Sequence, residues 1–255
     1  MNFIVSADTD VGIVKSTNQD SLSVMVLHTV QGKMAFAVLC DGMGGLEKGE
    51  VASASVVRAF REWVVRELPL LCEAPLEDAV IRRQWDRIIS EQNQAINRYG
   101  ASHGVRLGTT VVAMLLTDKR YYILNVGDSR AYELADGVRQ ITEDQSLIAR
   151  ELALGNITPE QAACDPRRNV LLQCVGVAKE VYPEMFFGEV RQNAVYMLCS
   201  DGFRHEISQK EMYDFLQPGV LFDDITMQAH TRSLIELNKQ RQERDNISVV
   251  LVRTF

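Results

Sequence analysis

One stretch of this 255-residue chain constrains its fold more than any other, because an apolar run there ends abruptly in a single carboxylate. Residues 35–40 are apolar, Asp41 follows them, and glycines stand at positions 42, 44, 45 and 49 before a helical pattern begins. A short apolar run bounded by turn residues is typical of a buried strand. Glycine lets the backbone approach a bound group closely. The stretch therefore predicts a strand that delivers Asp41 to an edge of the core, beside a metal-bound phosphate.

Strand patterns recur on both sides of this stretch and predict antiparallel pairing. Asp118-Lys119 and Asp136-Gly137 are typical hairpin connections, and Gln192-Asn193 is expected to join two further strands in the same way. The run 247–252 is apolar at nearly every position, which predicts a central strand buried on both faces. Strands are expected at 21–27, 33–40, 109–117, 121–126, 131–134, 138–141, 184–190 and 195–198, and residues 3–14 are expected to form a strand, a turn and a strand.

Helical periodicity appears in two long segments, at about 47–68 and 76–99, and in shorter ones near the C-terminus. The segment from about 146 to 168 carries two short helical patterns and is interpreted as an exposed excursion. Each long helix needs a sheet or another helix to cover its apolar side. We therefore predict an α+β fold with two stacked antiparallel sheets flanked by helices, forming a single domain over residues 1–255.

Composition narrows the class of function and the compartment. The formal net charge of −7 disfavours a nucleic-acid partner, because phosphate backbones repel an acidic surface. The five cysteines are odd in number and form no CxxC pair, which favours reduced thiols in a cytoplasmic protein. The N-terminus lacks a basic, apolar leader pattern and no apolar run approaches membrane-spanning length, so no membrane association is predicted.

Further aspartates sit where Asp41 sits, at the junction of an apolar strand with Gly, Ser or Asn. Each alone could be a turn residue, and Asp136-Gly137 is interpreted as one. Five acids converging on one edge would repel one another and raise each other's pKa values, which divalent cations relieve. Carboxylate oxygens without neighbouring His or Cys favour Mg²⁺ or Mn²⁺ over Zn²⁺. The four further aspartates are Asp20, Asp128, Asp201 and Asp245.

These acids belong to motifs whose kind and order resemble those of the metal-dependent protein phosphatase family (PPM, type 2C). The motifs are Asn-Gln-Asp at 18–20, Asp-Gly-Met-Gly-Gly at 41–45, Gly-Thr-Thr at 108–110, Val-Gly-Asp-Ser-Arg-Ala-Tyr at 126–132, Cys-Ser-Asp-Gly at 199–202 and Asp-Asn-Ile at 245–247. The form at 41–45 resembles that of bacterial members. The resemblance implies a four-layer αββα sandwich, the PPM-type phosphatase fold, with two or three divalent cations, Mn²⁺ or Mg²⁺, at one end of the sheets.

The resemblance also implies roles for individual residues. Asp41 would bridge two metal ions, and the carbonyl of Gly42 would bind one of them. Asp201 and Asp245 would hold one ion, and Asp20 the other through water. Asp128, together with Asp201, would bind a third ion.

The implied activity is hydrolysis of phosphoserine and phosphothreonine in proteins by direct attack of a water or hydroxide that bridges two metal ions. Asp41, Asp201, Asp245 and Asp20 are the catalytic candidates. The excursion at about 146–168 matches the family's flap, which influences substrate choice. The expected partners are phosphorylated proteins, targets of a bacterial Ser/Thr kinase, and the chain is expected to be a monomer.

Two positions depart from the family pattern. Lys15 stands where a phosphate-binding Arg is usual, and it keeps the charge without the bidentate fork. Met43 stands where animal members place a His that is proposed to protonate the leaving group. Lys15 is predicted to bind phosphate, with a merely solvated lysine as the alternative. A catalytically silent binding module that keeps the fold, and a phosphatase with one dedicated regulatory target, are the competing functions.

Overall fold

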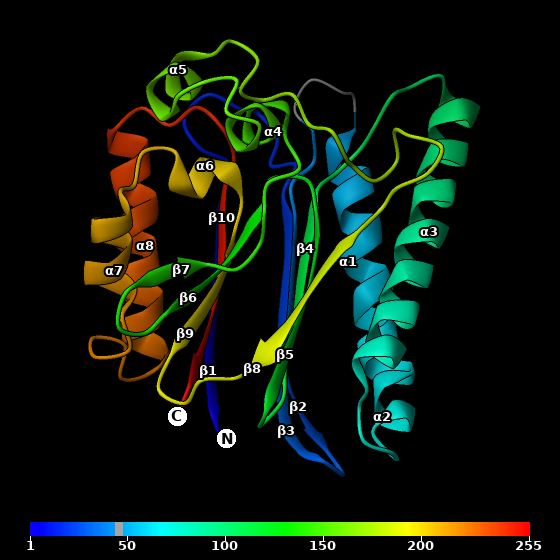
Figure 1. Cartoon of the computed structure of the whole chain (residues 1–255), viewed down its shortest axis with the longest axis vertical. Coiled ribbons are helices and arrows are strands. Elements are labelled where there is room, and N and C mark those ends of the chain that lie inside the picture. Colours follow the sequence, from blue (N-terminus) through cyan, green and yellow to red (C-terminus); the bar gives the residue numbers. More distant parts are fainter. Residues whose placement is uncertain (44–47) are drawn as a thin grey trace.

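Two five-stranded antiparallel sheets stack face to face in the computed structural model, which describes residues 1–43 and 48–255 (Figure 1). The first sheet has the order β1-β10-β9-β6-β7, and the second has the order β2-β3-β4-β5-β8. The first comprises β1 (Phe3–Asp10), β10 (Ile247–Thr254), β9 (Val195–Cys199), β6 (Arg130–Leu134) and β7 (Val138–Gln140). The second comprises β2 (Ser21–Thr29), β3 (Gly32–Cys40), β4 (Val111–Leu116), β5 (Arg120–Val126) and β8 (Glu184–Glu189).

Helices cover the outer face of each sheet and complete the predicted four-layer αββα arrangement (Figure 1). The second sheet carries α1 (Gly49–Arg66) and α3 (Asp78–His103), with the short α2 (Leu68–Leu71) between them. The first sheet carries α7 (Gln209–Leu216) and α8 (Asp224–Gln240). Three short helices, α4 (Leu147–Ala153), α5 (Pro159–Cys164) and α6 (Asp201–Arg204), lie together at one end of the sandwich (Figure 1).

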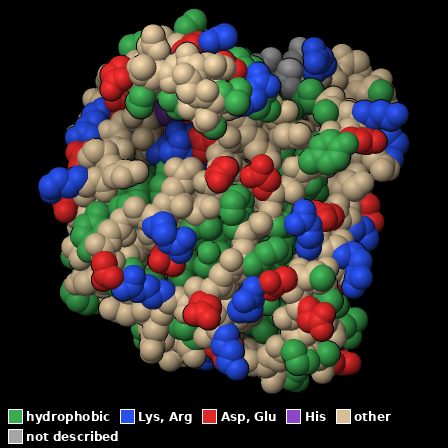
Figure 2. All heavy atoms as spheres, in the orientation of Figure 1, with side chains coloured by type: hydrophobic (Ala, Val, Ile, Leu, Met, Phe, Trp, Pro, Cys, Tyr) green, Lys and Arg blue, Asp and Glu red, His purple; other side chains and the backbone are tan. Residues whose placement is uncertain are grey.

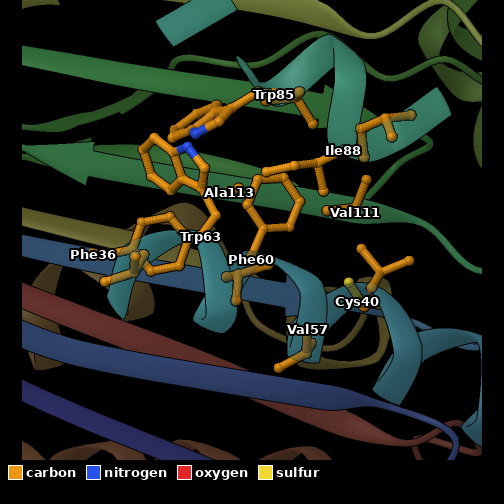
Figure 3. Close-up of a cluster of buried hydrophobic side chains, with 14 of the residues drawn as sticks. Phe36, Cys40, Val57, Phe60, Trp63, Trp85, Ile88, Val111 and Ala113 are labelled. Atoms are coloured by element: carbon orange, nitrogen blue, oxygen red, sulfur yellow. The ribbon is translucent and has the colours of Figure 1, made fainter. Parts of the chain in front are cut away.

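Apolar side chains fill all three interfaces between these layers. The interface of α1 and α3 with the second sheet holds an aromatic cluster, Phe36, Phe60, Trp63 and Trp85, whose side chains are almost wholly buried (Figure 3). The ring of Trp85 stands edge-on to Phe60 and Trp63, with centroids 5.7 and 5.8 Å apart. This edge-to-face geometry adds to the free energy gained by burying the rings. The cluster therefore fixes α1 and α3 on β3.

The structure confirms most predicted elements and corrects two. β10 is central in its sheet and buried along nearly its whole length, as predicted. The expected strand pair in residues 3–14 is wrong, because β1 is one strand that ends at Asp10. The hairpin across Gln192-Asn193 is also wrong: β8 pairs with β5, whereas β9 pairs with β10 and β6. That short connection crosses between the sheets, which sequence spacing alone does not reveal.

The two chain ends meet on the first sheet. Phe3 is paired with Thr254 in the β1–β10 ladder, and the backbone N–H of Asn2 donates to the carbonyl of Phe255 at 2.9 Å. Figure 1 places both termini at the end of the sandwich away from α4, α5 and α6. Among the described residues, no helix is both long and apolar enough to cross a membrane.

Candidate metal centre

All five predicted aspartates stand at strand ends or turns that reach the same end of the sandwich, where α4, α5 and α6 also lie (Figure 1). Antiparallel pairing produces this convergence, since the exit of one strand lies beside the entrance of the next. Asp41 follows β3, Asp20 precedes β2, Asp128 lies in the β5–β6 connection, Asp201 opens α6 after β9, and Asp245 precedes β10.

Two glycines allow the segments that carry the acids to touch. A Cβ at Gly202 would stand 2.2 Å from the carbonyl oxygen of Asn246, so only glycine lets the Asp201 and Asp245 segments meet. A Cβ at Gly42 would stand 2.5 Å from the carbonyl oxygen of Gln19, which joins the Asp41 and Asp20 segments. Gly44 and Gly45 of the same motif lie outside the described residues.

The Gly-Thr-Thr motif anchors the backbone of Asp41. The N–H of Asp41 donates to Oγ1 of Thr110 at 3.0 Å, and the N–H of Thr110 donates back to the carbonyl of Asp41 at 2.9 Å. Oγ1 of Thr110 also lies 2.7 Å from Oγ of Ser129, next to Asp128. Thr110 therefore links the Asp41 segment to the turn that carries Asp128.

The loop before β10 is held by two buried polar residues on either side of Asp245. Oδ1 of Asn246 accepts the N–H of Gln19 at 2.9 Å, which ties this loop to the segment of Asp20. Oε1 of Glu243 accepts the N–H groups of Arg244 and Asp245, and its Oε2 lies 3.2 Å from Nδ1 of His205. Nε2 of His205 lies 3.6 Å from Oδ2 of Asp201. Glu243 and His205 thus connect the Asp201 and Asp245 segments.

Sequence reasoning missed Glu243, because residues 239–244 look like the solvated end of a helix. Glu243 is in fact only 6% exposed. Burial raises the pKa of its carboxyl, but the hydrogen bonds from His205 and the backbone outweigh burial and leave the pKa lowered. Burial lowers the pKa of His205, and the bond to Glu243 with the charge of Asp201 reverses this and raises it. The signal available in the sequence was position alone, two residues before a predicted ligand.

The acids of the centre disturb one another's ionisation. Burial and the carboxylates of Asp201 and Asp245 raise the pKa of Asp20 to about 7. Asp41 keeps partial solvent contact, but its carboxyl is largely desolvated by the surrounding protein. This desolvation, followed by the charges of Asp20 and Asp201, raises the pKa of Asp41 well above the ordinary value. Burial and Asp201 likewise raise the pKa of Asp128. These couplings show that the five carboxylates occupy one region of the structure.

The donor atoms available there suit a hard divalent cation. Both carboxylate oxygens of Asp20 and Oδ1 of Asp201 are buried and have no partner in hydrogen-bond geometry among the described residues, although the nearby hydroxyls of Ser248 and Ser200 oppose the rise in the pKa of Asp20. An unpaired buried carboxylate is costly unless a cation compensates it, and carboxylate oxygens are the ligands preferred by Mg²⁺ and Mn²⁺. Among the described residues, no group of three or more His, Cys, Asp or Glu side chains stands in an arrangement that could itself hold a metal ion. The residues present fit such ions by the chemistry of their buried, unpaired oxygen donors.

Arginines satisfy a separate carboxylate next to the centre. Arg130 donates to both carboxylate oxygens of Asp144, each at 2.7 Å. Nη2 of Arg204 lies 3.7 Å from Asp144 and 3.8 Å from Asp128, and it donates to the carbonyl of Asp128 at 3.1 Å. Arg204, which the sequence did not single out, therefore supports the Asp128 turn.

Lys15 lies beside the centre, where its partner is a carboxylate. Its Nζ lies 3.1 Å from Oδ1 of Asp245, with 30% of the lysine side chain exposed. Met43 packs beside the Gly-Thr-Thr motif, and its N–H donates to the carbonyl of Gly108 at 3.1 Å. The predicted excursion forms α4 and α5 at this end of the molecule (Figure 1).

Known proteins that are similar to this chain, in sequence and in structure, are protein phosphatases of one family. The family model described as protein phosphatase 2C matches residues 13–234. The serine/threonine phosphatase stp of Listeria monocytogenes is 33% identical over 250 residues, which cover 96% of this chain and 93% of the relative. The crystal structure of serine/threonine phosphatase Stp1 from Staphylococcus aureus matches this structure with a TM-score of 0.85 at 28% identity. The match covers 100% of this chain and 96% of the Stp1 chain. The catalytic domain of the serine/threonine protein phosphatase PstP in complex with two manganese ions has a TM-score of 0.78 at 27% identity, and covers 99% of both chains.

Proposed function

Because this chain belongs to the protein phosphatase 2C family and is a serine/threonine protein phosphatase of that family, we propose that it hydrolyses phosphoserine and phosphothreonine at the carboxylate cluster described above. The observation that carries the proposal is the convergence of five aspartates, with buried oxygens of Asp20 and Asp201 left without a hydrogen-bond partner among the described residues. A silent binding module has no need of such costly unpaired acids.

The proposed ligand roles follow the resemblance of the motifs to those of the metal-dependent protein phosphatase family. By that resemblance, Asp41 and the carbonyl of Gly42 would hold the ions together with Asp20 and Asp201. Asp201 and Asp245 would hold one ion, Asp20 would help to hold another, and Asp128 with Asp201 would hold a third. When bound, Mn²⁺ or Mg²⁺ lowers the pKa of water toward neutrality and offsets charge on the phosphoryl group.

The chain's own residues position the reacting groups. Thr110, Asn246 and Glu243 fix the backbones of the acid-bearing segments through the hydrogen bonds described above. Lys15 stands at the edge of the cluster, where its ammonium can attract the phosphate oxygens. The α4–α5 excursion borders the same end and is assigned to substrate selection. Phosphorylated proteins, targets of a Ser/Thr kinase, are the proposed substrates.

The test is Mn²⁺-dependent hydrolysis of p-nitrophenyl phosphate and of matched phosphoserine, phosphothreonine and phosphotyrosine peptides. Chelation and Asp201→Asn should each abolish hydrolysis, and added Mn²⁺ should restore only the wild type. Lys15→Ala should raise KM for the phosphopeptides. The matched control is Asp136→Asn, which makes the same chemical change in an exposed turn and should leave activity intact. Activity that survives chelation would contradict the metal assignment, and an inactive wild type would favour the silent module.

A further inference from the structure

A groove of about 610 Å³ runs between the exposed flank of α1 and the start of β2. Ser21 and Leu22 line it on one side, and Arg58, Arg61 and Arg66 line it on the other. The groove begins beside the metal centre, because Ser21 directly follows Asp20. Oγ of Ser21 lies 3.0 Å from Oγ of Ser53 on α1, so helix and strand are joined where the groove opens.

The groove is basic on an otherwise acidic protein. Its three arginines face a single acid, Glu62, whereas the chain carries a net charge of −7. Basic and acidic side chains are interspersed over the face drawn in Figure 2. Two of the four arginines of α3 pair with acids: Arg82 with Asp86, and Arg87 with Glu67 and Glu91. Within residues 1–43 and 48–255, no acidic side chain forms an ion pair with Arg58, Arg61 or Arg66.

The wall of the groove opposite α1 can accept an extended chain. β2 is hydrogen-bonded only to β3, so its other edge has no partner strand among the described residues. An unpaired edge presents backbone N–H and C=O groups to a second peptide. Val65 of α1, 64% exposed, also lines the groove and offers an apolar contact. These features together suit an acidic peptide better than a small anion.

We propose that this groove binds acidic residues of a substrate protein next to the phosphorylated side chain, in an extended segment that leaves the metal centre along α1. The proposal rests on the proposed function, because the phosphoamino acid is what places the segment at Ser21. From Ala54 to Arg66 the helix rises about 18 Å, at about 1.5 Å per residue. An extended peptide spans that length with about five or six residues. The enzyme should therefore prefer phosphorylation sites that carry acids within about six residues on one side.

The test compares two phosphoserine peptides that differ only in a flank of four glutamates or four glutamines. Wild type should show the lower KM for the glutamate peptide, with kcat unchanged. The double variant Arg58→Ala/Arg61→Ala should raise that KM about three- to tenfold, as expected for losing two solvent-exposed charge contacts. Its KM for the glutamine peptide, its hydrolysis of p-nitrophenyl phosphate and its melting temperature should match wild type.

The control is Arg82→Ala/Arg83→Ala, which removes the same two charges from the exposed side of α3 and should not affect peptide preference. Equal KM values for the two peptides in wild type, or an equal effect of the two double variants, would overturn the proposal. A fluorescent, unphosphorylated glutamate peptide tests binding without catalysis, so an inactive enzyme that still binds it through Arg58 and Arg61 separates failure of the proposed function from failure of the groove. Displacement of that peptide by an RNA oligonucleotide at lower concentration than by unlabelled peptide would assign the groove to a different ligand.

Discussion

β3 connects two regions of opposite energetic character. Phe36, near its middle, packs among Phe60, Trp63 and Trp85, where every ring is buried against another (Figure 3). Asp41, just past its end, meets carboxylates that raise its pKa, and Asp20 beside it accepts no hydrogen bond from a described residue. The aromatic cluster stabilises the fold, whereas the carboxylates oppose it. The packing of Phe36 therefore offsets part of the free energy that the carboxylates at the end of the same strand cost.

The largest change in stability is expected from removing one ring of the aromatic cluster. Trp85→Ala should lower the free energy of unfolding by about 3–5 kcal/mol, because it removes a fully buried ring that three others contact. For a chain of this length the melting temperature should fall by about 10 °C. Thermal unfolding monitored by circular dichroism measures it. The control, Phe222→Ala, removes a 70% exposed ring and should change little. A loss as small as that of the control would show that the cluster does not hold β3.

A smaller change in stability, of opposite sign, is expected when one carboxylate of the metal centre is removed. Without metal, Asp41→Asn should raise the melting temperature by a few degrees, since it removes a carboxyl whose ionisation is opposed by its surroundings and by the charges of Asp20 and Asp201, an effect of about 1–3 kcal/mol. The same variant should lose Mn²⁺ binding in calorimetry. Asp136→Asn, in an exposed turn, is the matched control. A less stable Asp41→Asn protein would mean that Asp41 is stabilising even without an ion.

The raised pKa values in the carboxylate cluster predict how stability depends on pH. The folded-state pKa values of Asp20, Asp41 and Asp128 are raised above their unfolded values, so the folded state binds more protons between pH about 4 and the raised values. Stability of the metal-free protein should therefore fall as pH rises from 5 to 8. The raised pKa of His205 acts in the same direction. Melting curves in chelator measure the slope, and Asp41→Asn should flatten it. A melting temperature that rises over this range would contradict the assignment.

The smallest effect, on metal affinity, is expected from Glu243, which together with His205 connects the Asp201 and Asp245 segments. Glu243→Gln removes the charge that faces His205 but keeps an oxygen for the backbone N–H groups of Arg244 and Asp245. Mn²⁺ affinity should fall about tenfold, the lower range for residues that orient metal ligands. Calorimetry measures it directly. Glu236→Gln, on the exposed side of α8, should leave the affinity unchanged, and an equal loss in both variants would indicate a general charge effect.

The predictability of the site followed from where its residues sit along the chain. The five aspartates could be found because each marks the end of an apolar run, and strand ends of an antiparallel sheet gather at one edge. Glu243 and Arg204 could not be found in this way. Their importance depends on contacts with His205 and Asp128, and these arise only after β9, α6 and β10 have packed.

The fold was predictable to the level of layers but not of strand partners. Periodicity identified α1, α3 and the buried β10, since each pattern follows directly from which face meets the core. The expected hairpin at Gln192-Asn193 was wrong, because the same residue types occur in a short turn within one sheet and in a short crossing between two stacked sheets. The basic groove was not predicted either, because Arg58 and Arg61 are adjacent to Ser21 only through the packing of α1 on the second sheet.

The meeting of the two chain ends has a practical consequence. Asn2 and Phe255 exchange backbone hydrogen bonds at the pole of the molecule opposite the carboxylates (Figure 1). A tag, a tether or a fused module attached at either end would leave the protein there and would not obstruct substrate entry. The ends are also close enough to be joined by a short linker. The chain could then be reopened in an exposed loop. The resulting circular permutant would keep the strands that assemble the metal centre.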